Sequence, residues 1–183
     1  MEHKNLLYII SDEHRRDALG CYGHPQVKTP NLDRLAANGV RFTNAYTPCP
    51  MCVPARAALH TGRWVHQIGS WSSAEPYAGQ VEGWAHRLRS AGHRVTSIGK
   101  LHFRGSDPRN GFSEEILPLH VMNGTGWTHG LLRDELPSYD RGTLEFAQQI
   151  GRGESSYTDY DRRITQQACA WLHQRAATPD DRP

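Results

Sequence analysis

The sequence predicts an α/β layered domain with a mostly parallel central sheet flanked by helices. Short apolar runs with the length of buried strands alternate along the chain with segments in which apolar residues recur at the helical period. Polar residues directly follow two of these predicted strands, at residues 11–13 and 99–102. Because ligands bind beyond the carboxyl ends of parallel strands, both polar groups are expected at one edge of the sheet.

The N-terminal part of the chain predicts a strand, a helix and a second strand. Residues 5–11 form an apolar run with a β-branched pair, which is typical of a buried parallel strand. Thr29 then caps a helix that has Pro30 at its first position and Gly39 as its end. Residues 40–46 alternate apolar and polar side chains, the period of a half-buried strand. The buried face of the helix is expected to carry Leu32, Leu35 and Ala36.

The middle of the chain predicts two helices and another strand. Pro54 begins a helix that ends near Gly62. Residues 82–91 form a further helix, which Gly92 ends. Residues 94–98 form a strand that leads directly into the second group of polar residues.

The last third of the chain predicts mostly loops and one helix. Residues 105–156 are rich in loop-forming residues and predict only short elements. Thr158 and Asp161, three residues apart, have the spacing of a capping box at the start of a final helix. Its buried face is expected to carry Ile164, Ala168, Trp171, Leu172 and Arg175.

Composition excludes several classes of partner. The 183 residues carry a formal net charge of +2 with acids and bases interspersed, so no basic stripe predicts binding to nucleic acid. The apolar run at residues 6–10 is too short for a signal-peptide core or a membrane span, which favours a cytoplasmic protein without a membrane partner. The four cysteines lack the spacing of a disulfide framework and are expected to be reduced.

An acidic pair, Asp12 and Glu13, directly follows the first predicted strand. Two adjacent carboxylates repel each other unless a cation lies between them, and hard oxygen ligands suit Ca²⁺, Mg²⁺ or Mn²⁺. Taken alone, the pair is more typical of a solvated acidic turn than of a metal site, and the other patterns in the chain reverse that balance.

Cys49 and Cys52 form a C-x-x-C pattern, which is compatible with a redox dithiol or half of a zinc site. A zinc site needs two further ligands, and the other cysteines, Cys21 and Cys169, are distant in the sequence. The Pro-Ala-Arg sequence after Val53 favours a different chemistry for Cys52.

Lys100 and His102 follow the predicted strand at residues 94–98 and are two residues apart. On an extended segment, side chains at this spacing point to the same side. A lone Lys-x-His pair is usually an exposed pair without a specific function, but its place at a strand end favours a functional role.

Four short patterns therefore stand at separated positions: Ser-Asp-Glu at 11–13, Thr-Pro-Asn-Leu-Asp-Arg-Leu at 29–35, Cys-Val-Pro-Ala-Arg at 52–56 and Gly-Lys-Leu-His at 99–102. Together they resemble the N-terminal part of a type I sulfatase, the formylglycine-dependent family of the alkaline-phosphatase superfamily. The resemblance is dense over residues 4–105. It implies an alkaline-phosphatase-like layered domain.

The resemblance implies a modified nucleophile and a metal. A formylglycine-generating or maturase enzyme would oxidise Cys52 to formylglycine, an aldehyde whose hydrate carries two geminal hydroxyls. One hydroxyl attacks sulfur and expels the alcohol, and the other then eliminates the sulfate. Asp12, Glu13 and the modified Cys52 would hold a divalent metal, Ca²⁺ in preference to Mg²⁺ or Mn²⁺. Glu13 stands where the family usually has a second Asp.

Three further side chains belong to the active site that the resemblance implies. Arg56, one helical turn after Cys52, would hold the geminal hydroxylate and a metal ligand through its guanidinium. Lys100 would neutralise a sulfate oxygen, and His102 would bond the formylglycine hydroxyl and assist its deprotonation. Lys100 and His102 are therefore expected to bind the substrate as well.

Residues 1–183 are expected to form the N-terminal part of a sulfatase catalytic domain that is incomplete at its C-terminus. A polar, Pro-flanked run at residues 178–183 comes after the last helix, a composition that usually leads into another strand. The family's remaining metal ligands, leaving-group acid and second substrate lysine come from later segments. We therefore expect this chain alone to bind metal weakly and to turn over poorly.

The leading functional prediction is a sulfuric-ester hydrolase that acts on a small sulfate monoester. Residues 99–103 with Asn-Gly-Phe at 110–112 resemble the choline-sulfatase-like subgroup. Residues 49–56 and Gln-Ile-Gly at 67–69 are similar to phosphonate monoester hydrolases, so a phosphonate monoester or phosphodiester hydrolase is the alternative. A third reading is a catalytically silent fragment or interaction module, whose unpaired sheet edge would favour association, including a homo-oligomer.

Overall fold

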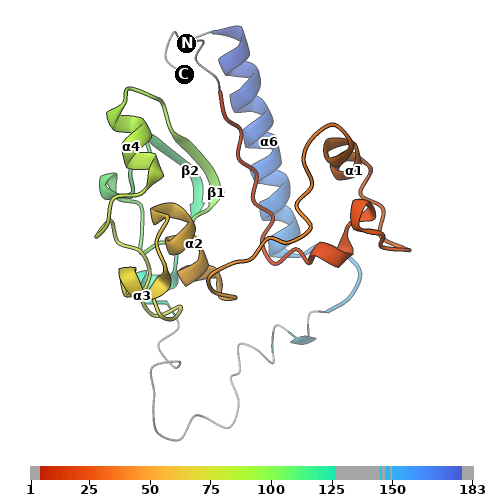
Figure 1. Ribbon diagram of the computed structural model, residues 1–183, viewed down its shortest axis with the longest axis horizontal. Coiled ribbons are helices and arrows are strands. Elements are labelled where there is room, and N and C mark those ends of the chain that lie inside the picture. The colour runs from red at the N-terminus through yellow and green to blue at the C-terminus, as the bar shows by residue number, and fades with distance from the viewer. Residues whose placement is uncertain (1–4, 127–144, 146, 149, 179–183) are drawn as a thin grey trace, which may run out of the picture. The chain divides into compact units, whose positions relative to one another are not determined.

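The computed structural model describes residues 5–126, 145, 147–148 and 150–178 of the chain (Figure 1). The chain divides into two compact units, residues 1–47 and 48–183. Residues 179–183, on which the expectation of a further strand depends, lie outside the described residues. Part of the loop-rich segment predicted at 105–156 also lies outside them.

The first unit is built around a short helix, α1 (Pro30–Ala37), and two 3₁₀ turns, η1 (Arg16–Ala18) and η2 (Gly20–Tyr22). Thr29 precedes α1 as predicted, but its hydroxyl donates to Asp33 Oδ1 at 2.9 Å instead of capping the helix backbone. The same Asp33 oxygen accepts the Cys21 N–H at 2.7 Å. This carboxylate therefore fastens α1 to η2 and gives the Thr-Pro-Asn-Leu-Asp-Arg-Leu pattern a structural role.

Three predictions in the first unit are wrong. Residues 5–11 and 40–46 form no strand, and the apolar side chains from Leu6 to Ile10 are 47–84% exposed. A strand is defined by the neighbour that hydrogen-bonds to it, and the sheet in the described part of the chain joins only two strands of the second unit. The helix face is also different, because Leu32 and Leu35 are 43% and 67% exposed.

The second unit begins with three short helices, two of which contribute residues to its hydrophobic core. They are α2 (Cys52–Thr61), α3 (Val65–Ile68) and α4 (Trp84–Ser90). Gly62 ends α2 in the left-handed conformation, as the sequence predicts, and α4 lies within the predicted range 82–91. The core cluster consists of Ala57, Ile68, Tyr77, Leu101 and Phe103.

The sheet of the second unit pairs β1 (Thr96–Lys100) with β2 (Glu114–Leu119) in parallel. β1 confirms the predicted strand, shifted by two residues toward its C-terminus. β2 lies in the segment predicted to be mostly loops, between the short turns η3 (Pro108–Asn110) and η4 (Met122–Gly124). The sequence did not predict this strand because it contains Pro118, and proline is rare inside sheets.

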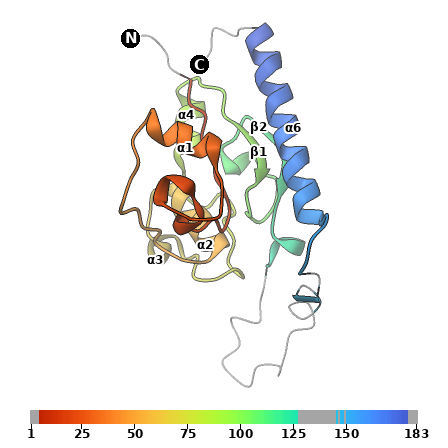
Figure 2. The same cartoon turned by 90° about the vertical axis from the view of Figure 1, so that its right-hand side faces the viewer.

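The long helix α6 (Ser156–Ala177) packs along β1 (Figures 1 and 2). Its capping box is formed by Ser155 and Thr158, three residues before the predicted pair at Thr158 and Asp161. Leu172 is 42% exposed, so it lies off the buried face on which it was predicted. Among the described residues, no helix has both the length and the apolar character needed to cross a bilayer. The half-buried residues of α6 recur at helical spacing: Tyr160, Ile164, Gln167, Ala168, Trp171 and Arg175.

Candidate active site

Cys52 is the first residue of α2, two residues earlier than the predicted start at Pro54. The first helical hydrogen bond runs from Ala55 N to Met51 O at 3.0 Å, so Cys52 lies in the turn whose N–H groups have no acceptor within the helix. Val53 and Pro54 are buried and hold this turn against the core. The half-buried side chain of Cys52 is thus at the positive end of the helix dipole, where negative charge is stabilised.

Arg56 connects the cysteine helix to the end of the sheet. It is four residues after Cys52, which places both side chains on one face of α2. Its Nη1 donates to the main-chain oxygen of Lys100, the last residue of β1. The structure therefore brings together two of the patterns that the sequence singled out, although they are 44 residues apart.

The segment from Lys100 to His102 is attached to β2 by main-chain hydrogen bonds. Leu119 O accepts from Leu101 N at 3.2 Å and from His102 N at 2.7 Å. His102 has a φ of 59°, in the left-handed region. The predicted extended segment therefore ends at Lys100, because the backbone turns at His102, and the shared direction of the two side chains stays a prediction.

Asp12 and Glu13 lie in a short turn of the first unit. Both side chains are exposed, and Glu13 has a left-handed φ of 55°. Ser11 Oγ and His14 Nδ1 are 3.0 Å apart and close the turn around the acidic pair. Two exposed carboxylates next to each other are donors that suit a hard divalent cation, so this turn fits the predicted metal. Because the other predicted site residues belong to the second unit, the joint site stays a prediction.

The titratable groups of the second unit with shifted pKa values include the half-buried Tyr160 of α6 and the buried His60 of α2. Burial raises the pKa of Tyr160, while the positive charge of Arg56 acts in the opposite direction. Burial also lowers the pKa of His60 to about 4, and the neighbouring His86 adds to this. Sequence reasoning missed Tyr160, whose place near the end of the sheet depends on the packing of α6, and no sequence pattern marks it.

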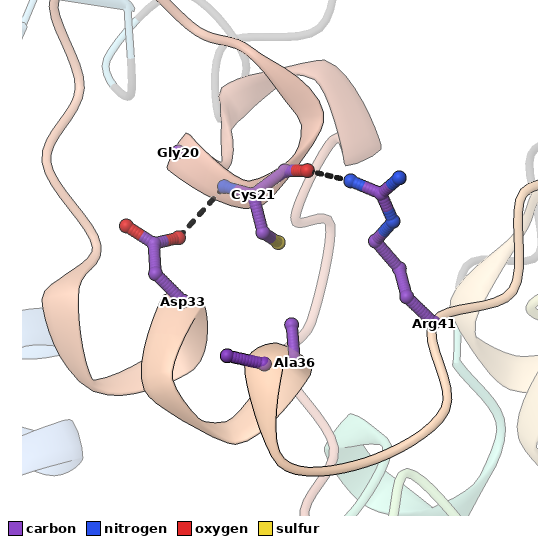
Figure 3. Close-up of a pocket in the computed structure, with 6 residues that line it drawn as sticks. Gly20, Cys21, Asp33, Ala36 and Arg41 are labelled. Atoms are coloured by element: carbon purple, nitrogen blue, oxygen red, sulfur yellow. Dashed lines mark hydrogen bonds between the residues drawn. The ribbon is translucent and has the colours of Figure 1, made fainter.

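A cavity of about 370 Å³ lies in the first unit, between η2 and α1 (Figure 3). Figure 3 shows Asp33 and Arg41 binding the main chain of Cys21 from two sides. None of the predicted catalytic or metal residues lines this cavity. It therefore adds no residue to the predicted active site.

Comparison with known proteins gives one family. Residues 4–183 match the family model described as Sulfatase. The chain is 37% identical over 131 residues to arylsulfatase A of Homo sapiens, a match that covers 68% of this chain and 26% of that protein. It is also 37% identical over 124 residues to choline-sulfatase of Rhizobium meliloti, covering 68% and 24%. The chain thus spans about a quarter of the length of these curated relatives.

Solved structures confirm the fold class. The crystal structure of Ps i-CgsB in complex with k-i-k-neocarrahexaose matches with a TM-score of 0.60 and 21% identity, covering 91% of this chain and 40% of that one. The predicted α/β class with parallel strands and flanking helices is therefore confirmed, and together with the family match it is the predicted alkaline-phosphatase-like layered domain.

Proposed function

This chain belongs to the sulfatase family, and on that premise we propose that it carries the nucleophile of a metal-dependent sulfuric-ester hydrolase. The nucleophile is a formylglycine hydrate derived from Cys52, and the substrate is a small sulfate monoester. One observation carries this proposal: Cys52 occupies the first turn of α2, and Arg56 on the same face bonds to the end of β1 at Lys100. A nucleophile, a helix N-terminus and a cationic segment thus belong to one unit.

The chemistry needs two hydroxyls on the β-carbon of residue 52. One hydroxyl oxygen attacks sulfur, the bond between sulfur and the ester oxygen breaks, and the alcohol leaves with a proton. The second hydroxyl then loses its proton, the carbon–oxygen bond to the sulfate breaks, and sulfate leaves as the aldehyde forms again. The N–H groups of the first turn of α2 favour the negative charge that the sulfate brings.

Arg56, Lys100 and His102 support these steps. Lys100 neutralises a nonbridging oxygen of the sulfate, and His102 takes the proton from a geminal hydroxyl. Arg56 donates from one guanidinium nitrogen to the Lys100 main chain, and in the proposed mechanism its planar fork of donors also holds the hydroxylate. Because Arg56 belongs to the nucleophile helix and bonds to the Lys100 main chain, it helps to set the spacing between the two.

Asp12 and Glu13 would hold the divalent metal together with the modified residue 52, and Ca²⁺ is the ion we expect in preference to Mg²⁺ or Mn²⁺. Bound there, the ion supplies positive charge that lowers the pKa of a hydroxyl and neutralises sulfate. The proposal also requires a formylglycine-generating or maturase enzyme as a partner during synthesis. A cytoplasmic location remains an expectation from the sequence.

Turnover by the purified protein tests the proposal. The protein should be coexpressed with a formylglycine-generating enzyme and assayed with aryl sulfate and aryl phosphonate monoesters at matched leaving groups. Cys52→Ala should abolish sulfate release, whereas Cys49→Ala should retain most of it, because only residue 52 precedes the x-Pro-x-Arg pattern. A preference for the phosphonate ester would favour a phosphonate monoester hydrolase. If the Cys52→Ala variant releases sulfate as fast as the unsubstituted protein, Cys52 is not the source of the nucleophile.

A further inference from the structure

A β-bulge precedes the Lys100–His102 segment. At the bulge, Gly99 of β1 faces two residues of β2, Leu117 and Pro118. Gly99 has a φ of 101° and Leu117 a φ of 49°, both in the left-handed region. A left-handed leucine is strained by about 1 kcal/mol or more, so surrounding contacts must hold it in this conformation.

Helix α6 supplies those contacts on both strands. The hydroxyl of Tyr160 donates to Leu117 O at 2.6 Å. One turn later, Ile164 packs so closely on Gly99 that a Cβ there would lie 2.9 Å from Ile164 Cδ1. Tyr160 and Ile164 are four residues apart and both half-buried, so one face of α6 clamps the bulge.

The bulge sets the pairing of the two strands beyond it. Because β2 gains one residue there, Leu119 is the residue that pairs with Lys100. Leu119 O then accepts the main-chain N–H groups of Leu101 and His102. A shift of Leu117 would therefore move the acceptor that fixes the turn at His102.

We propose that Tyr160 is a positioning residue for His102, because its hydroxyl fixes the Leu117 carbonyl and thereby the bulge that places Leu119 O beneath the His102 N–H. The catalytic consequence rests on the proposed function, in which His102 takes a proton from the hydroxyl at residue 52. The conformational part depends only on the hydrogen bonds of the second unit.

The test replaces Tyr160 by Phe and uses Tyr157→Phe as the matched control. Tyr157 is on the same helix and is 61% exposed, so the same atom is removed from an exposed tyrosine, whereas the donor to Leu117 O is Tyr160. Amide hydrogen exchange is measured at His102 and at Ser113, whose N–H bonds to Val95 O at the other end of the ladder. Steady-state kinetics on an aryl sulfate give kcat and KM separately.

For Tyr160→Phe we expect exchange of the His102 amide to rise about fivefold to tenfold, the effect of one lost hydrogen bond. Exchange at Ser113 should change less than twofold. The value of kcat should fall about tenfold with KM within twofold, because Tyr160 orients a proton-transfer group. Tyr157→Phe should change the His102 exchange and kcat less than twofold, because the hydroxyl that bonds to Leu117 O belongs to Tyr160.

Unchanged exchange at His102 would overturn the inference, because it would show that the Tyr160 hydroxyl does not affect the His102 N–H. An equal rise at Ser113 would also overturn it, because it would show a general loosening of the sheet. If the protein shows no sulfate release while the local exchange pattern holds, the proposed function fails and the positioning role stands. Should Tyr160→Phe fold poorly, Ile164→Val loosens the same clamp and should give the same pattern at smaller amplitude.

Discussion

Acid should destabilise the second unit through His60, the buried histidine at the end of α2. Its side chain is 3% exposed, and its ring contacts those of Tyr77 and Phe103 with centroids 4.9 and 5.1 Å away. Burial, with a smaller contribution from His86, lowers the pKa of His60 from 6.5 to about 4. Between these pH values the unfolded chain binds a proton that the folded protein does not. The stability is therefore fully present above pH 6.5 and is lost as the pH falls toward 4.

The magnitude comes from the two pKa values. At about 1.36 kcal/mol for each pH unit, the passage from 6.5 to about 4 removes about 3 kcal/mol of unfolding free energy. This is a large part of the 5–15 kcal/mol that is usual, so acid unfolding should begin at a moderate pH.

The assay is urea unfolding of the protein and of His60→Leu between pH 7 and pH 4. Leucine is apolar and does not titrate, and His60 Nε2 has no hydrogen-bond partner in the described part of the chain. The loss of stability over this pH range should be smaller in the variant by about 3 kcal/mol, because other titrating groups act equally in both proteins. The same pH dependence in both proteins would refute the reasoning.

Three further predictions concern the β-bulge, Arg56 and the turn that contains Asp12 and Glu13. Gly99→Ala should lower the free energy of unfolding in urea by about 2–4 kcal/mol. Gly92→Ala is the control, since Gly92 has a similar left-handed φ but open space around it, and should lower it by only about 1 kcal/mol. Equal losses in the two variants would contradict the close packing of α6 on Gly99. Arg56→Lys should lower kcat/KM for an aryl sulfate about tenfold to a hundredfold, since lysine lacks the planar fork with which Arg56 bonds to the Lys100 main chain and, in the proposed mechanism, holds the hydroxylate. Kinetics equal to those of the unsubstituted protein would contradict that role. Added Ca²⁺ should raise the melting temperature of the protein but not that of Asp12→Asn, and an equal rise would place the ion elsewhere.

The helices were predictable because their signals are local. Pro30 at a first helical position and glycines at the helix ends fix the boundaries of α1, α2 and α4 to within about two residues. The start of α2 was placed too late, since proline is tolerated throughout the first helical turn and not only at its first position.

The strands were less predictable because pairing is not local. An apolar run such as residues 5–11 has the composition of a strand, but a strand forms only beside a partner. Conversely, β2 has Pro118 in its bulge and lies in a segment whose composition predicts loops. The turn at His102 has the same origin, since it depends on a carbonyl of β2 and not on neighbours in sequence.

The candidate site was predicted residue by residue from its resemblance to the family, and the structure joins Arg56 to Lys100. What sequence could not supply is Tyr160, since a tyrosine in the first turns of a polar helix has no distinguishing pattern. Its contact with Leu117 exists only because α6 packs on the bulge.

Mass spectrometry of the tryptic peptide that spans residues 42–56 tests the central claim most directly. This peptide contains both Cys49 and Cys52, so one cysteine serves as the internal control for the other. In protein coexpressed with a formylglycine-generating enzyme, we predict that residue 52 has exchanged its sulfur for an aldehyde oxygen, reactive toward a hydrazide, and that Cys49 keeps its thiol. An intact thiol at residue 52 under those conditions would contradict the account.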